Sequence, residues 1–107
     1  MIRGIGIDVI SIDRIRRAMQ NPRFLPRILT PKELEQARDV AYVAGRWAGK
    51  EAIAKAVSTR LSWQDVEILA DDTGAPRVHW RNGSNAVVWL SISHDKSVAV
   101  ACAVWEE

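Results

Sequence analysis

The sequence has almost no cysteine and no long apolar run, and each lack excludes a class of protein. Its single cysteine, Cys102, cannot form an internal disulfide, so we expect a reducing compartment and a packing role for this side chain in an apolar strand. The longest apolar run, near the C-terminus, is cut by His94, Asp95 and Lys96 well short of a membrane span. We therefore expect a cytoplasmic protein without membrane contact.

Motifs that define several enzyme classes are also missing. The chain has no Walker A loop, no dinucleotide-binding glycine fingerprint and no cysteine–histidine set with zinc spacing. It offers no convincing nucleophile–base–acid triad. Because it has 107 residues and no internal repeat or linker, we expect one domain, residues 1–107. A domain this small has a small hydrophobic core, so we expect contacts between subunits to bury additional apolar surface.

The net charge of +2 is unevenly distributed. Residues 1–29 hold six arginines against two aspartates, a net charge of +4, so the rest of the chain is acidic. A basic segment of this kind indicates an anionic partner, which could be a nucleic acid, a phosphorylated ligand or an acidic protein. A solvated helix face explains the charge equally well.

The pattern of apolar residues predicts a leading strand, then helices, then further strands. We expect strands over 2–10, 65–70, 76–80, 87–93 and 98–105, and helices over 12–20, from Pro31 onward, and over 40–58. The last helix is small or apolar on most sides, which indicates burial. The last two strands would form an antiparallel hairpin in the middle of the sheet. The chain is thus predicted to be an α+β domain, a mainly antiparallel sheet packed against a long buried helix and shorter helices.

The leading strand carries a carboxylate, Asp8, among apolar residues. Gly4 and Gly6 share its face and would leave open space beside it. Burying an unpaired carboxylate costs several kcal/mol. Asp8 is therefore expected either to pair with a cation or to hold a metal ion.

The buried helix carries charged residues of its own. Glu51 and Lys55 lie four residues apart, hence on one face, and would line a cleft because the helix lacks a clear polar face. Arg46 and Lys50 flank them and would add positive potential for phosphates. His94 ends a strand where the hairpin turns, either as a capping or solvated residue or as a donor to a phosphate.

Two hard carboxylates, a lysine and clustered arginines suit magnesium-assisted phosphoryl chemistry, so the residues alone predict a metal-dependent site that handles phosphate. Three segments carry more information: residues 4–17 are GIGIDVISIDRIRR, residues 44–56 are AGRWAGKEAIAKA, and residues 90–94 are LSISH. Their order and spacing resemble the holo-[acyl-carrier-protein] synthase branch of the 4′-phosphopantetheinyl transferases. The resemblance implies that family's fold, and the transfer of 4′-phosphopantetheine from coenzyme A to a serine of an apo acyl carrier protein.

The same resemblance implies roles for individual residues. Asp8 and Glu51 would hold Mg²⁺, while Glu51 and Lys55 would act in catalysis, with Lys55 close to the departing 3′,5′-ADP. A second group would bind coenzyme A, partly across a subunit boundary: Arg46, Lys55, Pro76 and His94.

The resemblance also implies partners and assembly. Arg14 matches a position on the helix that docks the carrier protein, so the basic N-terminal third would meet an acidic carrier. Family members of this size are homotrimers with active sites between subunits, and no nucleic-acid partner is expected.

Three segments depart from the family's pattern, one of them the turn Gly74-Ala75-Pro76, which lacks the lysine of the family's Gly-Lys-Pro. After Lys55 the family runs into a glycine-rich loop that wraps the nucleotide, whereas residues 57–62 are shorter and hold no glycine. The segment before Leu90 is short too, so a helix expected there is reduced to residues 84–86. A two-carboxylate metal-dependent nuclease and a non-catalytic degenerate paralogue are the alternative functions.

Overall fold

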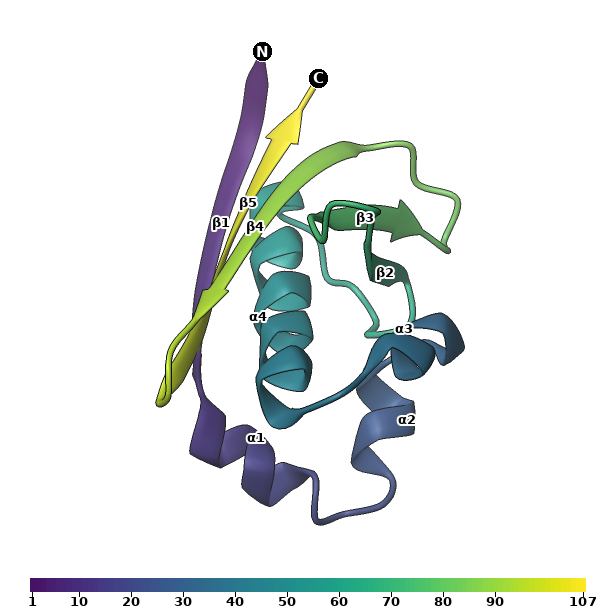
Figure 1. The fold of residues 1–107 in the computed structure, drawn as a ribbon. Helices are drawn as coiled ribbons and strands as arrows, with labels where there is room; N and C mark the ends of the chain where they lie inside the picture. The colour runs from purple at the N-terminus through teal and green to yellow at the C-terminus, as the bar shows by residue number, and fades with distance from the viewer.

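The computed structural model describes residues 1–107 and shows five strands and four helices. In chain order they are β1 (Ile2–Ser11), α1 (Ile12–Ala18), α2 (Phe24–Ile28), α3 (Pro31–Gln36), α4 (Val40–Val57), β2 (Val66–Ala70), β3 (Pro76–Trp80), β4 (Val87–His94) and β5 (Val98–Glu106). β1, β5 and β4 form one antiparallel sheet in that order, and β2 pairs with β3 in a second. Figure 1 shows α4 lying along one face of the larger sheet, with the β2–β3 pair beyond the helix.

The predicted strands and long helices are confirmed to within two residues at each boundary. The expected hairpin forms, but only β5 lies in the middle of the sheet, and β4 is an edge strand. The helix α2 was not expected, because five residues are too few to show a helical period. β3 and β4 are joined without a helix, so even the reduced helix that we expected over residues 84–86 is absent. None of the helices is long and apolar enough to cross a membrane.

The backbone of β1 lies directly against that of α4. A Cβ on Gly6 would lie 2.0 Å from the carbonyl oxygen of Ala52, and one on Gly4 would lie 1.9 Å from that of Ala56. β5 presents only small buried side chains to the same helix: Ala99, Ala101 and Ala103. Small residues on both surfaces let the helix lie directly on the sheet. The open space that we expected beside Asp8 is therefore filled by α4.

A buried ion pair joins α3 to α4 and β2. Thr30 and Glu33 form the expected capping box at the start of α3. One Glu33 oxygen accepts a hydrogen bond from Lys50 Nζ at 2.7 Å, and the other accepts one from the Ile68 amide at 2.7 Å. The expectation that Lys50 adds positive potential for phosphates is wrong, because its side chain is only 3% exposed and its ammonium is paired with Glu33. Burial lowers the pKa of Lys50, while Glu33 opposes this shift.

No helix or strand covers the face of the larger sheet that points away from α4 (Figure 1). Ile5, Ile7 and Val9 of β1 are each about 60% exposed there, and Trp89 of β4 is half exposed. Cys102 is paired with Ile7 in the register and is also exposed, so its expected packing role in the core is wrong. Sequence alternation places these residues on one face but does not say which face a helix will cover. Exposed apolar side chains gathered on one sheet face are typical of contact sites between proteins.

We expect Gly6→Ala to destabilise the fold by about 1–3 kcal/mol, because the added methyl group meets backbone atoms that cannot move aside. Urea unfolding followed by tryptophan fluorescence measures this loss. Gly45→Ala is the matched control, since its Cβ would meet only a side-chain atom, Ile92 Cγ2, at 3.0 Å. Equal losses in the two variants would contradict the special role of the β1–α4 approach.

Candidate functional site

Three of the predicted site residues lie together where β1 passes α4, and we call Asp8, Glu51 and Lys55 the Asp8 group. The Lys55 ammonium donates to an Asp8 carboxylate oxygen at 3.2 Å and to the Ile7 carbonyl oxygen at 3.1 Å. Glu51 precedes Lys55 by one helical turn, so its side chain leaves α4 on the same side. The Asp8 side chain is 15% exposed and that of Lys55 is 55% exposed. Asp8 is therefore paired with a cation at the rim of the molecule, one of the two alternatives that the sequence left open.

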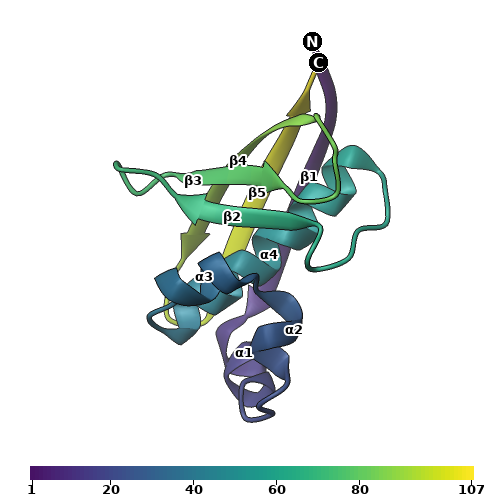
Figure 2. The same cartoon turned by 90° about the vertical axis from the view of Figure 1, so that its right-hand side faces the viewer.

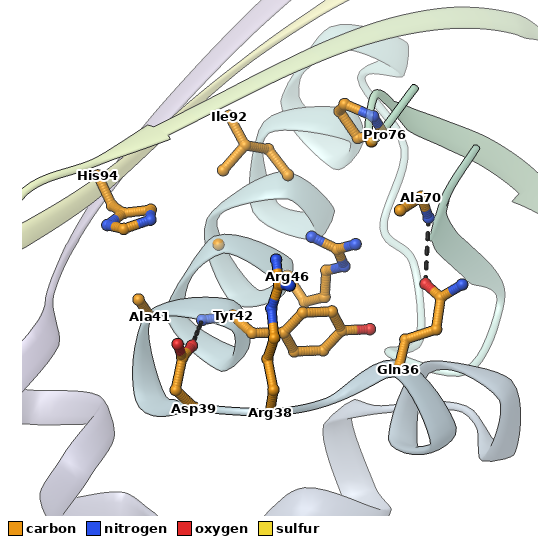
Figure 3. Close-up of a pocket in the computed structure, with 12 residues that line it drawn as sticks. Gln36, Arg38, Asp39, Ala41, Tyr42, Arg46, Ala70, Pro76, Ile92 and His94 are labelled. Carbon is orange, nitrogen blue, oxygen red and sulfur yellow. Dashed lines mark hydrogen bonds between the residues drawn. The ribbon is translucent and has the colours of Figure 1, made fainter. Parts of the chain in front are cut away.

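Three other predicted residues, Arg46, Pro76 and His94, line a separate cavity of about 680 Å³, which we call the Arg46 cavity. Figure 3 shows His94 and Pro76 on opposite sides of it, with Arg46 and Tyr42 between them. A volume of this size is typical of pockets that bind cofactors. The structure thus brings these three residues together, but apart from the Asp8 group.

Arg46 is held in the cavity by contacts on two sides. Its Nε donates to the Ile68 carbonyl oxygen at 3.1 Å, and its guanidinium carbon lies 4.1 Å from the centroid of the Tyr42 ring. Tyr42 donates its hydroxyl to the Glu33 carbonyl oxygen at 2.9 Å, and burial raises the pKa of this phenol. Because only Nε of Arg46 is used, the two terminal nitrogens remain available to an anion.

The β2–β3 turn forms one wall of the Arg46 cavity and places Pro76 there. Asp71 organises this turn by accepting hydrogen bonds from the Thr73 hydroxyl at 2.6 Å, the Arg77 Nε at 2.8 Å, and the amides of Thr73 and Ala75 at 2.9 and 3.0 Å. These donors, the Thr73 hydroxyl first, hold the pKa of Asp71 well below its usual range. A single carboxylate thereby fixes the shape of the wall.

The Asp8 group and the Arg46 cavity lie on opposite sides of α4. Arg46 and Lys55 are nine residues apart on α4, about two and a half turns, so their side chains leave the helix on opposite sides. β1, which carries Asp8, passes α4 at Ala52, and β4, which ends at His94, passes it at Gly45, about two turns nearer the start of the helix. β1 and β4 are the two outer strands of the larger sheet, separated by β5. One chain therefore holds two half-sites that do not face each other.

Arg14 lies at the basic end of the molecule, where α1 and α2 gather (Figure 2). Its guanidinium carbon is 6.0 Å from the centroid of the Trp47 ring. Trp47 stacks on Phe24, with centroids 5.9 Å apart, and its centroid lies 4.4 Å from that of Trp63. We call Phe24, Trp47 and Trp63 the aromatic stack. Trp47 precedes Glu51 by one turn of α4, so the stack adjoins the Asp8 group.

Sequence reasoning missed four polar residues of the Arg46 cavity: Gln36, Arg38, Asp39 and Tyr42. They lie at the end of α3 and the start of α4, where no motif marks them. The one local signal is Asp39, whose carboxylate accepts a hydrogen bond from the Tyr42 amide at 2.8 Å and so caps α4. Arg38 adds a further cationic side chain to the cavity.

Comparisons with known proteins agree with this geometry. The family model described as the 4′-phosphopantetheinyl transferase superfamily matches residues 4–103. The chain belongs to this family. A holo-[acyl-carrier-protein] synthase of Oceanobacillus iheyensis is 45% identical over 116 residues, which cover 99% of this chain and 98% of the relative. Its counterpart in Geobacillus kaustophilus is 45% identical over 117 residues, covering 99% of this chain and 90% of the relative.

Solved structures share the fold over the whole chain. A holo-(acyl-carrier-protein) synthase from Bacillus anthracis, in complex with coenzyme A (3′,5′-ADP), has a TM-score of 0.90 at 40% identity and covers 100% of this chain and 98% of its own. One from Neisseria meningitidis has a TM-score of 0.89 at 36% identity, with 100% of both chains covered. The predicted α+β fold of the 4′-phosphopantetheinyl transferases is thus confirmed.

Asp71 should make the stability of the cavity wall depend on pH. Because its pKa is lower in the folded chain than the ordinary 3.8, its contribution is complete above that value and is lost as the pH falls below it. We expect Asp71→Asn to lower Tm at about pH 6 and to lower it by progressively less as the pH falls from about 4 to about 2. Asp72→Asn, at an exposed neighbour, is the control. A Tm difference between Asp71→Asn and wild type that stays constant over this range would contradict the assignment.

Proposed function

We propose that this protein transfers 4′-phosphopantetheine from coenzyme A to a serine hydroxyl of an apo acyl carrier protein, releasing 3′,5′-ADP. The observation that carries the proposal is the pairing of two half-sites, a carboxylate–lysine group and a cationic cavity of cofactor size. Relatives named for this activity, at 40% and 45% identity over nearly the whole chain, support it. With an acyl carrier protein as substrate, the protein would serve fatty acid, polyketide or another carrier-dependent biosynthesis, and we propose that it does so in the cytoplasm.

The two alternative functions are not favoured. A metal-dependent nuclease would share the two carboxylates, but the family match over residues 4–103 belongs to transferases. A non-catalytic paralogue would be free to lose the Asp8 group, yet Asp8, Glu51 and Lys55 are all retained and lie on one side of α4.

The Arg46 cavity would bind the nucleotide end of coenzyme A. Arg46, Arg38 and His94 supply hydrogen-bond donors and positive charge for phosphate groups. Pro76 and the neutral Tyr42 ring supply surface against which an adenosine can pack. The cavity therefore offers both positive charge for phosphate groups and a ring surface for a nucleoside.

The Asp8 group fits a magnesium ion. Asp8 and Glu51 offer carboxylate oxygens, and Mg²⁺ is usually held by one or two carboxylates while water and substrate phosphates complete its shell. The chain has no group of three or more acidic, histidine or cysteine side chains that could hold a metal ion. Two carboxylates therefore suit a metal ion whose remaining ligands are water and substrate phosphates. With Asp8 engaged in this way, the Lys55 ammonium would turn from Asp8 to the substrate.

The reaction requires a proton acceptor for the serine and a stabilised leaving group. When bound, Mg²⁺ would supply charge stabilisation at the pyrophosphate. Glu51 would accept the proton of the serine hydroxyl as the serine oxygen attacks the β-phosphorus. Lys55 would donate a proton to the bridging oxygen as its bond to the β-phosphorus breaks, so that 3′,5′-ADP leaves with less negative charge.

The basic end of the molecule would dock the carrier protein. Residues 1–29 carry the net charge of +4 that complements an acidic partner. Arg14 is exposed and forms no ion pair with an acidic side chain, so it is available for one. Because the aromatic stack beneath Arg14 adjoins Glu51, a carrier bound there would present its serine close to the Asp8 group.

A complete site would need two copies of the chain, because α4 separates the two half-sites within one copy. One subunit would supply the Asp8 group and its neighbour the Arg46 cavity. A head-to-tail contact of this kind closes into a ring when the rotation allows it, and the proposed homotrimer is such a ring. The uncovered apolar face around Ile7 would provide the buried surface between subunits.

The direct test is intact-mass spectrometry of an apo acyl carrier protein incubated with this protein, coenzyme A and Mg²⁺. We expect the carrier to gain about 340 Da, the mass of one phosphopantetheine group, and to gain nothing when EDTA is present. Absence of any gain across several acidic carrier proteins would contradict the proposed function.

We expect Asp8→Asn and Glu51→Gln each to lower kcat/KM by at least about a hundredfold, because several kcal/mol of charge stabilisation are lost with a metal ligand. Glu35→Gln, an exposed acid of α3, is the control and should leave transfer unchanged. Near-normal activity of either site variant at limiting Mg²⁺ would remove that residue from the metal site.

A further inference from the structure

The short helix α2 ends against side chains from two distant parts of the chain. The last carbonyl groups of a helix have no partners inside it. Here the side-chain nitrogen of Gln64 lies 2.9–3.2 Å from the carbonyl oxygens of Pro26, Arg27 and Leu29. Lys50 Nζ donates to the remaining carbonyl oxygen, that of Ile28, at 2.8 Å. Two side chains thus satisfy four consecutive carbonyl groups.

The orientation of the Gln64 amide is determined by its other neighbour. Arg81 Nη1 donates to Gln64 Oε1 at 2.8 Å and to the Gln64 carbonyl oxygen at 3.2 Å. A guanidinium group has donors only, so the amide oxygen must face Arg81 and the amide nitrogen must face α2. A carboxylate at this position would place an oxygen against the carbonyl oxygens of α2.

Lys50 completes the attachment of α2 from the other side. Besides Ile28 and Glu33, it donates to the carbonyl oxygen of Trp63 at 2.7 Å. Lys50 comes from the middle of α4, and Trp63 and Gln64 close the loop that follows α4. The position of α2 relative to α4 is therefore set by two buried or half-buried polar contacts rather than by helix propensity.

The segments held in this way carry the two outer members of the aromatic stack. Phe24 is the first residue of α2, Trp63 precedes Gln64, and both pack on Trp47, over which Arg14 lies. We propose that Gln64, assisted by Lys50, is a positioning residue for carrier recognition: it holds α2 and the aromatic stack as a preformed support for Arg14. This inference rests on the proposed function, because it assumes that the carrier protein docks at Arg14.

The test compares steady-state kinetics of Gln64→Glu and Gln64→Met with those of the wild type. Met keeps the length of the side chain without its donors or a charge, so an effect common to both variants cannot come from charge. We expect KM for the carrier to rise about tenfold, because loss of the Gln64 contacts would displace Arg14 by a fraction of an ångström. We expect kcat and KM for coenzyme A to stay unchanged. Lys50→Met is avoided as the main variant because it leaves Glu33 buried without its cation.

A double-mutant cycle with Arg14→Ala shows whether Gln64 acts through the docking surface. If Gln64 acts by positioning Arg14, we expect Gln64→Met to change KM for the carrier much less in the Arg14→Ala background, where the contact of Arg14 with the carrier is already lost. Independent effects, an unchanged KM for the carrier, or parallel losses in kcat and both KM values would each overturn the inference. A wild-type protein without transferase activity would instead refute the proposed function itself, so the two failures are distinguishable.

Discussion

The functional site depends on how closely β1 lies against α4. Two glycines remove the side chains that would hold the strand away, and Asp8, on the same face of that strand, then meets Lys55 from the helix. A methyl group on Gly6 would push the strand outward and move Asp8 with it. The packing of the core and the geometry of the acidic half-site are therefore consequences of the same contact.

α4 forms the centre of the core and also separates the Asp8 group from the Arg46 cavity. Ten of its 18 residues are buried, including two that are charged. Buried charges are tolerated only when hydrogen bonds and counter-charges satisfy them. Lys50 is fully engaged by Glu33 and backbone carbonyls, whereas Arg46 keeps two nitrogens for the cavity. The charged side chains of this one helix thus divide into a structural lysine, an arginine for which we propose phosphate binding, and the Glu51–Lys55 pair beside β1.

The parts of this structure that sequence reasoning predicts are those coded locally. The capping box at Thr30, the alternation of β1 and the motif residues on α4 and β4 all depend on neighbours a few residues away. Contacts over longer separations were missed: Lys50 meets Glu33 across 17 positions, and Gln64 meets α2 across 35 to 38. Which face of the sheet α4 covers is likewise a tertiary choice, so the exposure of Cys102 was not predictable from its apolar surroundings.

If Asp8 of one subunit and His94 of its neighbour serve one site, two inactive variants should restore each other. The measurement mixes Asp8→Asn with His94→Ala, each with little activity alone at low coenzyme A, under conditions that let subunits exchange. In a head-to-tail ring, random exchange rebuilds both native halves at about a quarter of the interfaces, so we predict about a quarter of wild-type transfer. Activity no higher than the average of the two separate variants would contradict a site shared between subunits.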